Sequence, residues 1–167
     1  MSVDFFGKFK RYEILLEYKL LATNTPRHMY LYPNGEQNWS GLLFLHSGIY
    51  KHAAIEFMVV FDNFPEQAPV IYVQTPIYHP LIDRSGKFDA SYQFKMWKAS
   101  TDHVYHLLHF FNNTFREDVL LMINPVPVDH KKINESLRNQ NVHGFGSISI
   151  EPIDEDAFRK MRQIIFE

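Results

Sequence analysis

The sequence predicts an α+β fold in which a four-stranded antiparallel meander is flanked by helices. Two observations support this class: short β-rich runs gather in the first half of the chain, and helical patterns lie before and after them. Strands and helices that are segregated along the chain, and do not alternate, are typical of α+β proteins. With 167 residues, 46% of them hydrophobic, the chain can form a single domain with its own core.

The first helix is predicted over residues 4–22. Apolar side chains recur there at spacings of three and four residues, which places them on one helical face that we expect to be buried in the core. Asn24-Thr25-Pro26 ends this helix, because the residue before a proline avoids helical geometry. The expected core face consists of Phe5, Phe9, Tyr12, Leu16 and Leu20.

Four short strands are predicted after this helix. The third is the clearest, because Ile55, Phe57, Val59 and Phe61 alternate with other residues and define a buried face that we expect a helix to cover. Turn-forming prolines and glycines separate the runs, which favours an antiparallel meander. The four strands are predicted at residues 28–32, 39–46, 54–61 and 70–74.

A long connection follows at residues 75–100, in which apolar residues show no sustained helical or strand spacing. Its length indicates a functional loop. Thr101 or Asp102 is predicted to cap the next helix, and a further helix is predicted at residues 129–139. The core face of the capped helix is expected to contain Val104, Leu107, Leu108, Phe111 and Phe115.

The chain is predicted to divide into a core at residues 1–141 and a linker with a C-terminal helical extension at residues 142–167. Gly144 and Gly146 favour a linker, and Asp154 is placed to cap a closing helix.

An ordered set of residues carries a family resemblance. These residues are Gly48-Ile49-Tyr50, Phe61, Phe64-Pro65, Pro69, Ile77-Tyr78-His79-Pro80, Gly86 and Trp97. In order and spacing, the segment 5–139 resembles the ubiquitin-conjugating enzyme fold. The resemblance departs at His52-Ala53, which stand where that fold usually has two glycines. Trp97 is a large apolar side chain that can anchor the long loop.

Active members of that fold use a His-Pro-Asn motif followed by a cysteine that carries ubiquitin as a thioester. Here the motif is His79-Pro80-Leu81, the cysteine position falls at about Asp89, and the chain contains no cysteine. A carboxylate cannot form a thioester, and leucine has no amide to stabilise an oxyanion. We therefore expect no enzymatic activity. Ser91 is a poor alternative nucleophile because no base is identifiable beside it, and His79 is expected to hold the loop through backbone hydrogen bonds.

Further residues resemble a group of inactive variants. They are His79-Pro80-Leu81-Ile82-Asp83, Ser85-Gly86-Lys87-Phe88-Asp89, Phe94, Trp97 and His103-Val104-Tyr105. By these residues the chain is similar to the fused toes family, which includes the Akt-interacting protein and the insect protein crossbronx.

That resemblance implies a scaffold function. Its expected partners are a Hook-type coiled-coil adaptor and a Hook-interacting protein, in a complex that links vesicles or endosomes to dynein motors. The alternative is a ubiquitin-binding variant that assists an active conjugating enzyme or acts in protein sorting. The expected location is the cytoplasm, with attachment to the periphery of vesicles through partners.

Other chemistries have little support. The net charge of −2 and pI near 6.5 provide no broad attraction for nucleic acid, and no apolar run predicts direct membrane insertion. His103, His106 and His109 could be drawn as a metal site. They spread over about a third of the helix circumference and have no carboxylate or thiolate partner in sequence, so we expect them on a solvated face. Asp83 and Asp89 are interpreted as surface residues, and no cofactor is expected.

Overall fold

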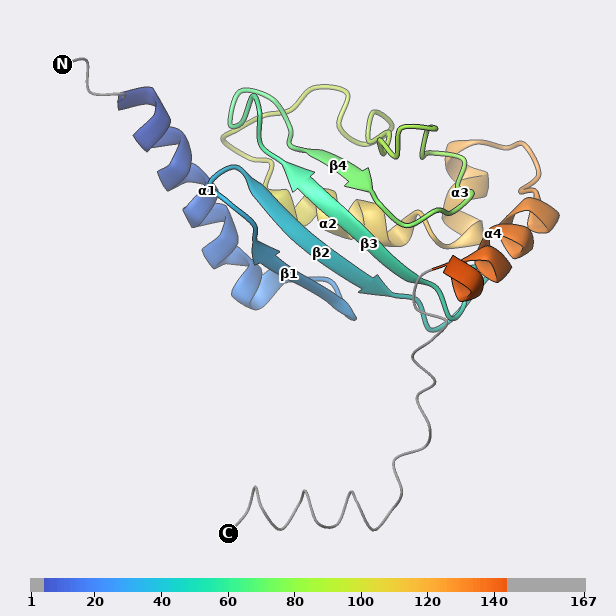
Figure 1. The fold of residues 1–167 in the computed structure, drawn as a ribbon. Coiled ribbons are helices and arrows are strands. Elements are labelled where there is room, and N and C mark those ends of the chain that lie inside the picture. The colour runs from blue at the N-terminus through green and yellow to red at the C-terminus, as the bar shows by residue number, and fades with distance from the viewer. Residues whose placement is uncertain (1–4, 144–167) are drawn as a thin grey trace, which may run out of the picture.

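The computed structural model describes residues 5–143, which form one antiparallel sheet with helices against one face and at its ends (Figure 1). The predicted α+β class and the four-stranded meander are confirmed. The elements are α1 (Phe5–Asn24), β1 (Met29–Pro33), β2 (Asn38–Phe44), β3 (Ala54–Val60), β4 (Val70–Val73), α2 (Val104–Asn113), α3 (Glu117–Ile123) and α4 (His130–His143).

The sheet has the order β1-β2-β3-β4, with each strand antiparallel to its neighbour in the chain. Alternate residues of β3 are fully buried, and the ring of Phe57 lies 5.0 Å from the ring of Phe111 on α2. Figure 1 shows α2 crossing behind the sheet, so α2 is the helix expected to cover the third strand. The other face of the sheet carries no helix within residues 5–143.

The expected core face of α1 is wrong. Phe5, Phe9 and Tyr12 are 69%, 48% and 59% exposed, whereas the buried side chains of this helix are those of Ile14, Glu17 and Leu21. The helical period is right, but the helix packs through its opposite side. Apolar residues on either face of a helix recur with the same spacing. The spacing alone therefore does not determine which face is buried against the rest of the fold.

The helices after the long loop differ from prediction at their ends. The N-cap of α2 is His103, and not Thr101 or Asp102 as predicted. The carboxylate of Asp102 instead accepts a hydrogen bond from the backbone N–H of Lys98 at 2.7 Å. All five predicted core residues of this region are buried, but α2 ends at Asn113, and Phe115 lies beyond it. The short helix α3 was not predicted, because seven residues give too few turns for a clear period.

α4 begins one residue later and ends four residues later than the predicted helix 129–139. The division at residue 141 stays a prediction, because the expected closing helix lies outside the described residues. Within residues 5–143, none of the helices combines the length and apolar character that crossing a bilayer would require.

Candidate functional site: the loop around His79 and Asp89

The long loop is fastened to the sheet by backbone pairing at Gly86. The backbone N–H of Val73 on β4 donates a hydrogen bond to the carbonyl of Gly86 at 2.7 Å, and Phe88 N–H donates to Ile71 at 2.9 Å. Gly86 has a φ of +87°, and a Cβ atom there would lie 2.3 Å from the carbonyl oxygen of Val73. Glycine is therefore the residue that this position requires.

His79 is buried under the loop with both ring nitrogens occupied. Its Nδ1 accepts a hydrogen bond from the backbone N–H of Leu81 at 3.1 Å, so Nε2 carries the proton and donates to the carbonyl oxygen of Thr114 at 2.9 Å. Burial lowers the pKa of His79 to about 4, so the ring is neutral near pH 7. These bonds are the backbone contacts that we expected for His79, and they leave no nitrogen to act as a base.

Tyr50 supports this histidine from the β2–β3 connection. Its hydroxyl donates a hydrogen bond to the carbonyl oxygen of Tyr78 at 2.8 Å, and its ring lies 5.5 Å from the ring of His79 and 5.3 Å from that of Phe115. Burial raises the pKa of Tyr50, so the hydroxyl stays a donor. The Ile-Tyr-His-Pro segment is therefore held from two sides.

The structure brings Asp89 next to Leu81, the two residues at which the family resemblance leads us to expect missing catalytic groups. The backbone N–H of Asp89 donates to the carbonyl oxygen of Leu81 at 2.8 Å. Asp89 is exposed, and its carboxylate accepts a hydrogen bond from the backbone N–H of Ser91 at 2.9 Å. Hydrogen bonds from the Ser91 hydroxyl and backbone keep the pKa of Asp89 below its usual range. The carboxylate is thus ionised and shapes the following turn.

An open pocket of about 550 Å³ lies beside this position. Pro80, Leu81 and Asp89 all line it, together with Phe94 from the loop and Leu107 from α2. Its lining is more apolar than polar, and it contains no histidine. The Ser91 hydroxyl bonds the carboxylate of Asp89 and no histidine within residues 5–143. Because the pKa of Asp89 is lowered, its carboxylate is a poor base for a serine hydroxyl.

Asp83 also supports a turn and does not face a second carboxylate. One of its oxygens accepts hydrogen bonds from the backbone N–H of Ser85 at 2.8 Å and of Lys87 at 3.0 Å. These bonds, with that of the Ser85 hydroxyl as the largest cause, lower the pKa of Asp83. Asp83 and Asp89 therefore build the loop as well as contributing surface charge.

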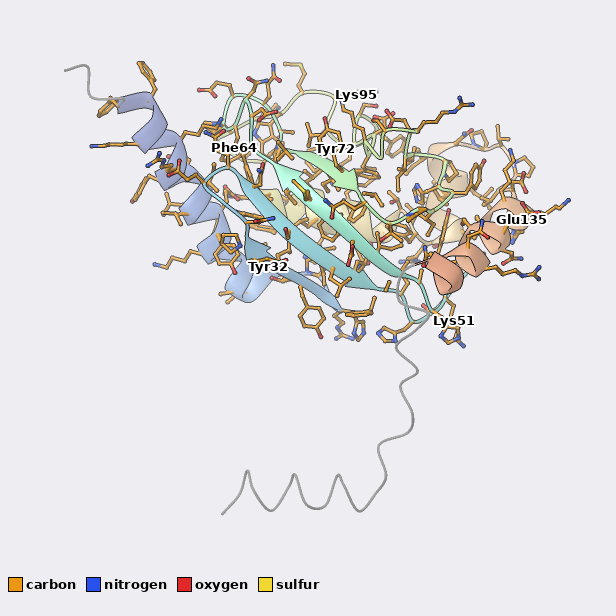
Figure 2. The ribbon with its side chains drawn as sticks, in the orientation of Figure 1. Tyr32, Lys51, Phe64, Tyr72, Lys95 and Glu135 are labelled. Carbon is orange, nitrogen blue, oxygen red and sulfur yellow. The ribbon has the colours of Figure 1, made fainter. Side chains whose placement is uncertain are left out.

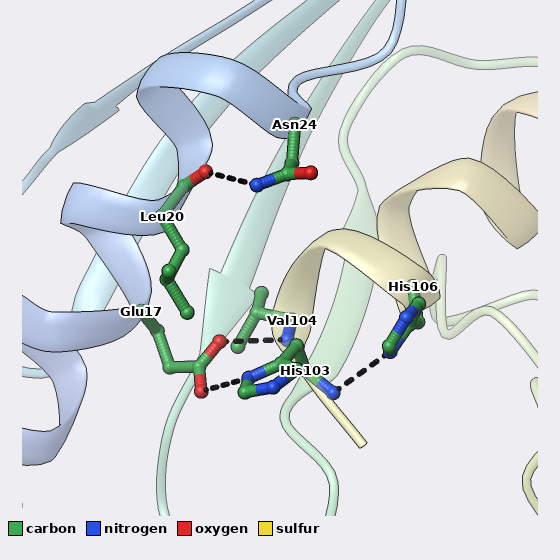
Figure 3. Close-up of polar contacts among 6 residues, drawn as sticks. All are labelled: Glu17, Leu20, Asn24, His103, Val104 and His106. Atoms are coloured by element: carbon green, nitrogen blue, oxygen red, sulfur yellow. Dashed lines mark hydrogen bonds and ion pairs between the residues drawn. The ribbon is translucent and has the colours of Figure 1, made fainter. Parts of the chain in front are cut away.

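Glu17 is a buried residue that the sequence reasoning missed. Its carboxylate accepts hydrogen bonds from the backbone N–H of Val104 at 2.9 Å and from Nδ1 of His103 at 3.0 Å (Figure 3). A carboxylate at a helix N-terminus satisfies free N–H groups and interacts favourably with the helix dipole. The sequence analysis expected the opposite face of α1 to be buried, so it contained no signal for Glu17.

His103, which precedes α2, and the two histidines within this helix take separate partners. His103 contacts Glu17, while Nδ1 of His106 accepts a hydrogen bond from the backbone N–H of His103 at 3.0 Å. Nε2 of His109 bonds the carbonyl oxygen of Asn24 at 2.8 Å. The solvated-face interpretation is wrong for His103 and His106, which are half-buried because they complete the start of α2.

Trp97 lies at the far end of the loop and packs between two aromatic rings. Its ring is 5.6 Å from that of Phe94 and 6.3 Å from that of Phe64. Trp97 is half-buried, and it anchors the loop by these apolar contacts.

Comparisons with known proteins agree with this geometry. A profile described as ubiquitin-conjugating enzyme matches residues 13–121. A "Protein crossbronx-like" of Drosophila mojavensis is 30% identical over 138 residues, covering 76% of this chain and 54% of that relative. A "Protein crossbronx homolog" of Anopheles gambiae is 29% identical over 160 residues, covering 91% of this chain and 68% of that relative. The chain spans about half the length of several of these curated relatives.

The fold also matches solved structures. A ubiquitin-conjugating enzyme E2 from Plasmodium falciparum superposes with a TM-score of 0.55 at 20% sequence identity, covering 62% of this chain and 96% of that enzyme. At this identity the match concerns the fold alone. The chain therefore belongs to the ubiquitin-conjugating enzyme family, as a variant of the crossbronx, or fused toes, type that contains no cysteine.

Proposed function

We propose that this chain is a non-catalytic scaffold subunit. It binds a Hook-type coiled-coil adaptor together with a Hook-interacting protein, and the complex links vesicles or endosomes to dynein in the cytoplasm. The non-catalytic part of the proposal is supported by Asp89, an exposed carboxylate beside Leu81, at about the position where the family resemblance leads us to expect the cysteine of active members. The adaptor and the transport role are supported by the similarity to relatives named crossbronx.

The scaffold is retained although the chemistry is not. His79, Tyr50 and Gly86 still fasten the loop through buried hydrogen bonds and a close backbone approach. A carboxylate cannot hold ubiquitin as a thioester, and the neighbouring Ser91 hydroxyl has no histidine beside it to act as a base. A preserved framework without its nucleophile favours binding over transfer.

The first test is loading of ubiquitin in the presence of activating enzyme and ATP. The wild-type chain is expected to give no thiol-sensitive adduct on a non-reducing gel. Asp89→Cys is the matched variant, because it places the only thiol of the chain at this position. Loading of the variant alone would locate the lost activity at residue 89, whereas an adduct on the wild-type chain would contradict the proposal.

The second test is co-purification of the tagged chain with the C-terminal segment of a Hook adaptor, with free ubiquitin as a parallel bait. Retention of the Hook segment is expected, and it should be unchanged in Asp89→Cys because binding does not need the carboxylate. Failure to retain the Hook segment, with the chain folded by circular dichroism, would overturn the adaptor role.

A ubiquitin-binding variant is the second candidate, favoured by the uncovered face of the sheet. Tyr30 and Phe44 contact each other there at 6.1 Å and are 62% and 39% exposed. Tyr32 and Tyr72 lie on the two outer strands (Figure 2) and are exposed as well. Retention of ubiquitin by the wild-type chain, lost in Tyr30→Ala, would favour this function over the adaptor role.

A further inference from the structure

The outward face of α1 has the spacing of a coiled-coil seam. Phe5, Phe9, Tyr12 and Leu16 follow one another at intervals of four, three and four residues. This is the alternation of d and a positions in a heptad repeat, in which apolar residues return every 3.5 residues on average. All four side chains are exposed, from 39% for Leu16 to 69% for Phe5.

No described helix or strand covers this seam, and only the loop at residues 62–67 borders it, at a pocket that Phe9 also lines. α1 packs on the rest of the domain through Ile14, Glu17 and Leu21, which lie on the opposite side of the helix. Figure 1 shows α1 at the edge of the fold, with no other described element on its outer side. A surface of large apolar residues in a row indicates a contact with another protein surface.

The residues that flank the seam are complementary to those of an identical helix. With Phe5 and Tyr12 at d positions and Phe9 and Leu16 at a positions, Lys8 takes a g position and Glu13 the e position five residues later. The next such pair is Leu15 and Leu20, both apolar. In parallel two-stranded coiled coils, a g residue meets the e residue of the following heptad on the other helix, where opposite charges select the partner.

We propose that two copies of this chain associate through α1 as a parallel two-helix coiled coil. Lys8 of each copy then lies beside Glu13 of the other, and Leu15 beside Leu20. Neither Lys8 nor Glu13 makes a side-chain hydrogen bond or ion pair within residues 5–143, so both are available. An antiparallel pair would place g positions against g positions and lose this charge match. The inference is independent of the adaptor role.

The apolar seam is short, because position d of the next heptad is Lys19. A charged residue in a seam lowers stability while defining the register. We therefore expect a reversible dimer whose mass depends on concentration, and which forms at about 1–100 µM, the range of small interfaces.

Sedimentation velocity on the full chain tests the dimer. The wild-type chain should move from monomer to dimer mass over this concentration range, and Phe9→Glu should stay monomeric while keeping the circular dichroism spectrum of the wild-type chain. A wild-type chain that remains monomeric at about 100 µM, or a dimer that survives Phe9→Glu, would overturn the proposal.

Charge exchange tests the register. Lys8→Glu and Glu13→Lys should each weaken the dimer about tenfold, because each replaces two attractive contacts by repulsive ones, and the double variant should recover it. Lys95→Glu makes the same charge change in the loop (Figure 2) and should have no effect. Failure of the double variant to recover the dimer would contradict the parallel register.

A single introduced thiol gives a second measurement of direction, since the chain has no cysteine of its own. Lys19→Cys lies at a d position near the end of the seam, where the two copies meet only in a parallel pair. It should form a disulfide-linked dimer under mild oxidation. Absence of this crosslink in a chain that dimerises would contradict the parallel arrangement.

Discussion

His79 determines how the candidate site responds to acid. In the folded chain its ring lies between Tyr50 and Phe115 and bonds two backbone groups, so protonation would break the bond that Nδ1 accepts from Leu81. The buried ring therefore holds the motif in place only while it is neutral.

This leads to a prediction about pH and stability. The pKa of His79 is lowered from 6.5 to about 4 by burial, so between these values the unfolded chain binds the proton and the folded chain does not. The contribution is fully present above pH 6.5 and is lost as the pH falls toward 4. The free energy of unfolding should decrease by about 2 kcal/mol more between pH 7 and pH 5 than in His79→Gln. Urea unfolding at pH 7 and pH 5 measures this difference. An equal change in the free energy of unfolding between the two pH values in both proteins would contradict the prediction.

A second prediction at this scale concerns Gly86. Gly86→Ala introduces a Cβ atom 2.3 Å from the carbonyl oxygen of Val73 and strains a φ of +87°. Gly48→Ala has a similar φ of +81° but meets no atom within 4 Å. The cost should be about 1 kcal/mol for Gly48→Ala, from backbone strain alone, and about 3 kcal/mol or more for Gly86→Ala. Thermal unfolding would measure both, and similar losses would show that the close approach is unimportant.

At the scale of elements, Glu17 joins α1 to the beginning of α2. Its carboxylate is buried and bonds both the backbone N–H of Val104 and the ring of His103. The first turn of α2 itself contains no acidic residue. α1 thus supplies the negative group that the N-terminus of α2 lacks.

Removal of this contact should be costly. Glu17→Ala leaves a buried N–H group and a histidine without their acceptor, and should lower the free energy of unfolding by about 1–3 kcal/mol. Glu17→Gln keeps the shape and one acceptor, so its loss should be smaller. Glu135→Ala, an exposed change on α4, serves as the control and should stay within about 0.5 kcal/mol in urea unfolding. Equal losses for Glu17→Ala and Glu135→Ala would show that the contact is unimportant.

For the whole molecule, the helices after the loop belong to the same core as the sheet. Leu120 on α3 and Ile133 on α4 are each 1% exposed and lie in the cluster of buried residues that includes Phe57 and Phe111. The C-terminal helices are therefore expected to unfold together with the sheet and not as a separate unit.

Ile133→Ala tests this unity. It should lower the free energy of unfolding by about 2–4 kcal/mol, with one transition whose denaturant dependence is unchanged. Leu121→Ala, on an α3 residue that is 43% exposed, should cost much less. A separate early transition in Ile133→Ala, seen by circular dichroism but not by tryptophan fluorescence, would mean that α4 unfolds independently.

The sequence by itself determined the class of fold, the order of the strands and the absence of a cysteine nucleophile. Periodicity and turn residues are local, so the alternation in 54–61 could be interpreted without the structure. The ordered motif from Tyr50 to Trp97 also located the loop, and with it His79, Leu81 and Asp89.

Only the tertiary structure decided which face of α1 is buried, because both faces of that helix are apolar and the choice depends on what packs against it. It also decided the partners of Glu17, which lies 86 residues before His103 in the chain. No local pattern connects such distant residues. Their contact arises from the packing of α1 beside α2, and that packing leaves the outer seam of α1 free for another molecule.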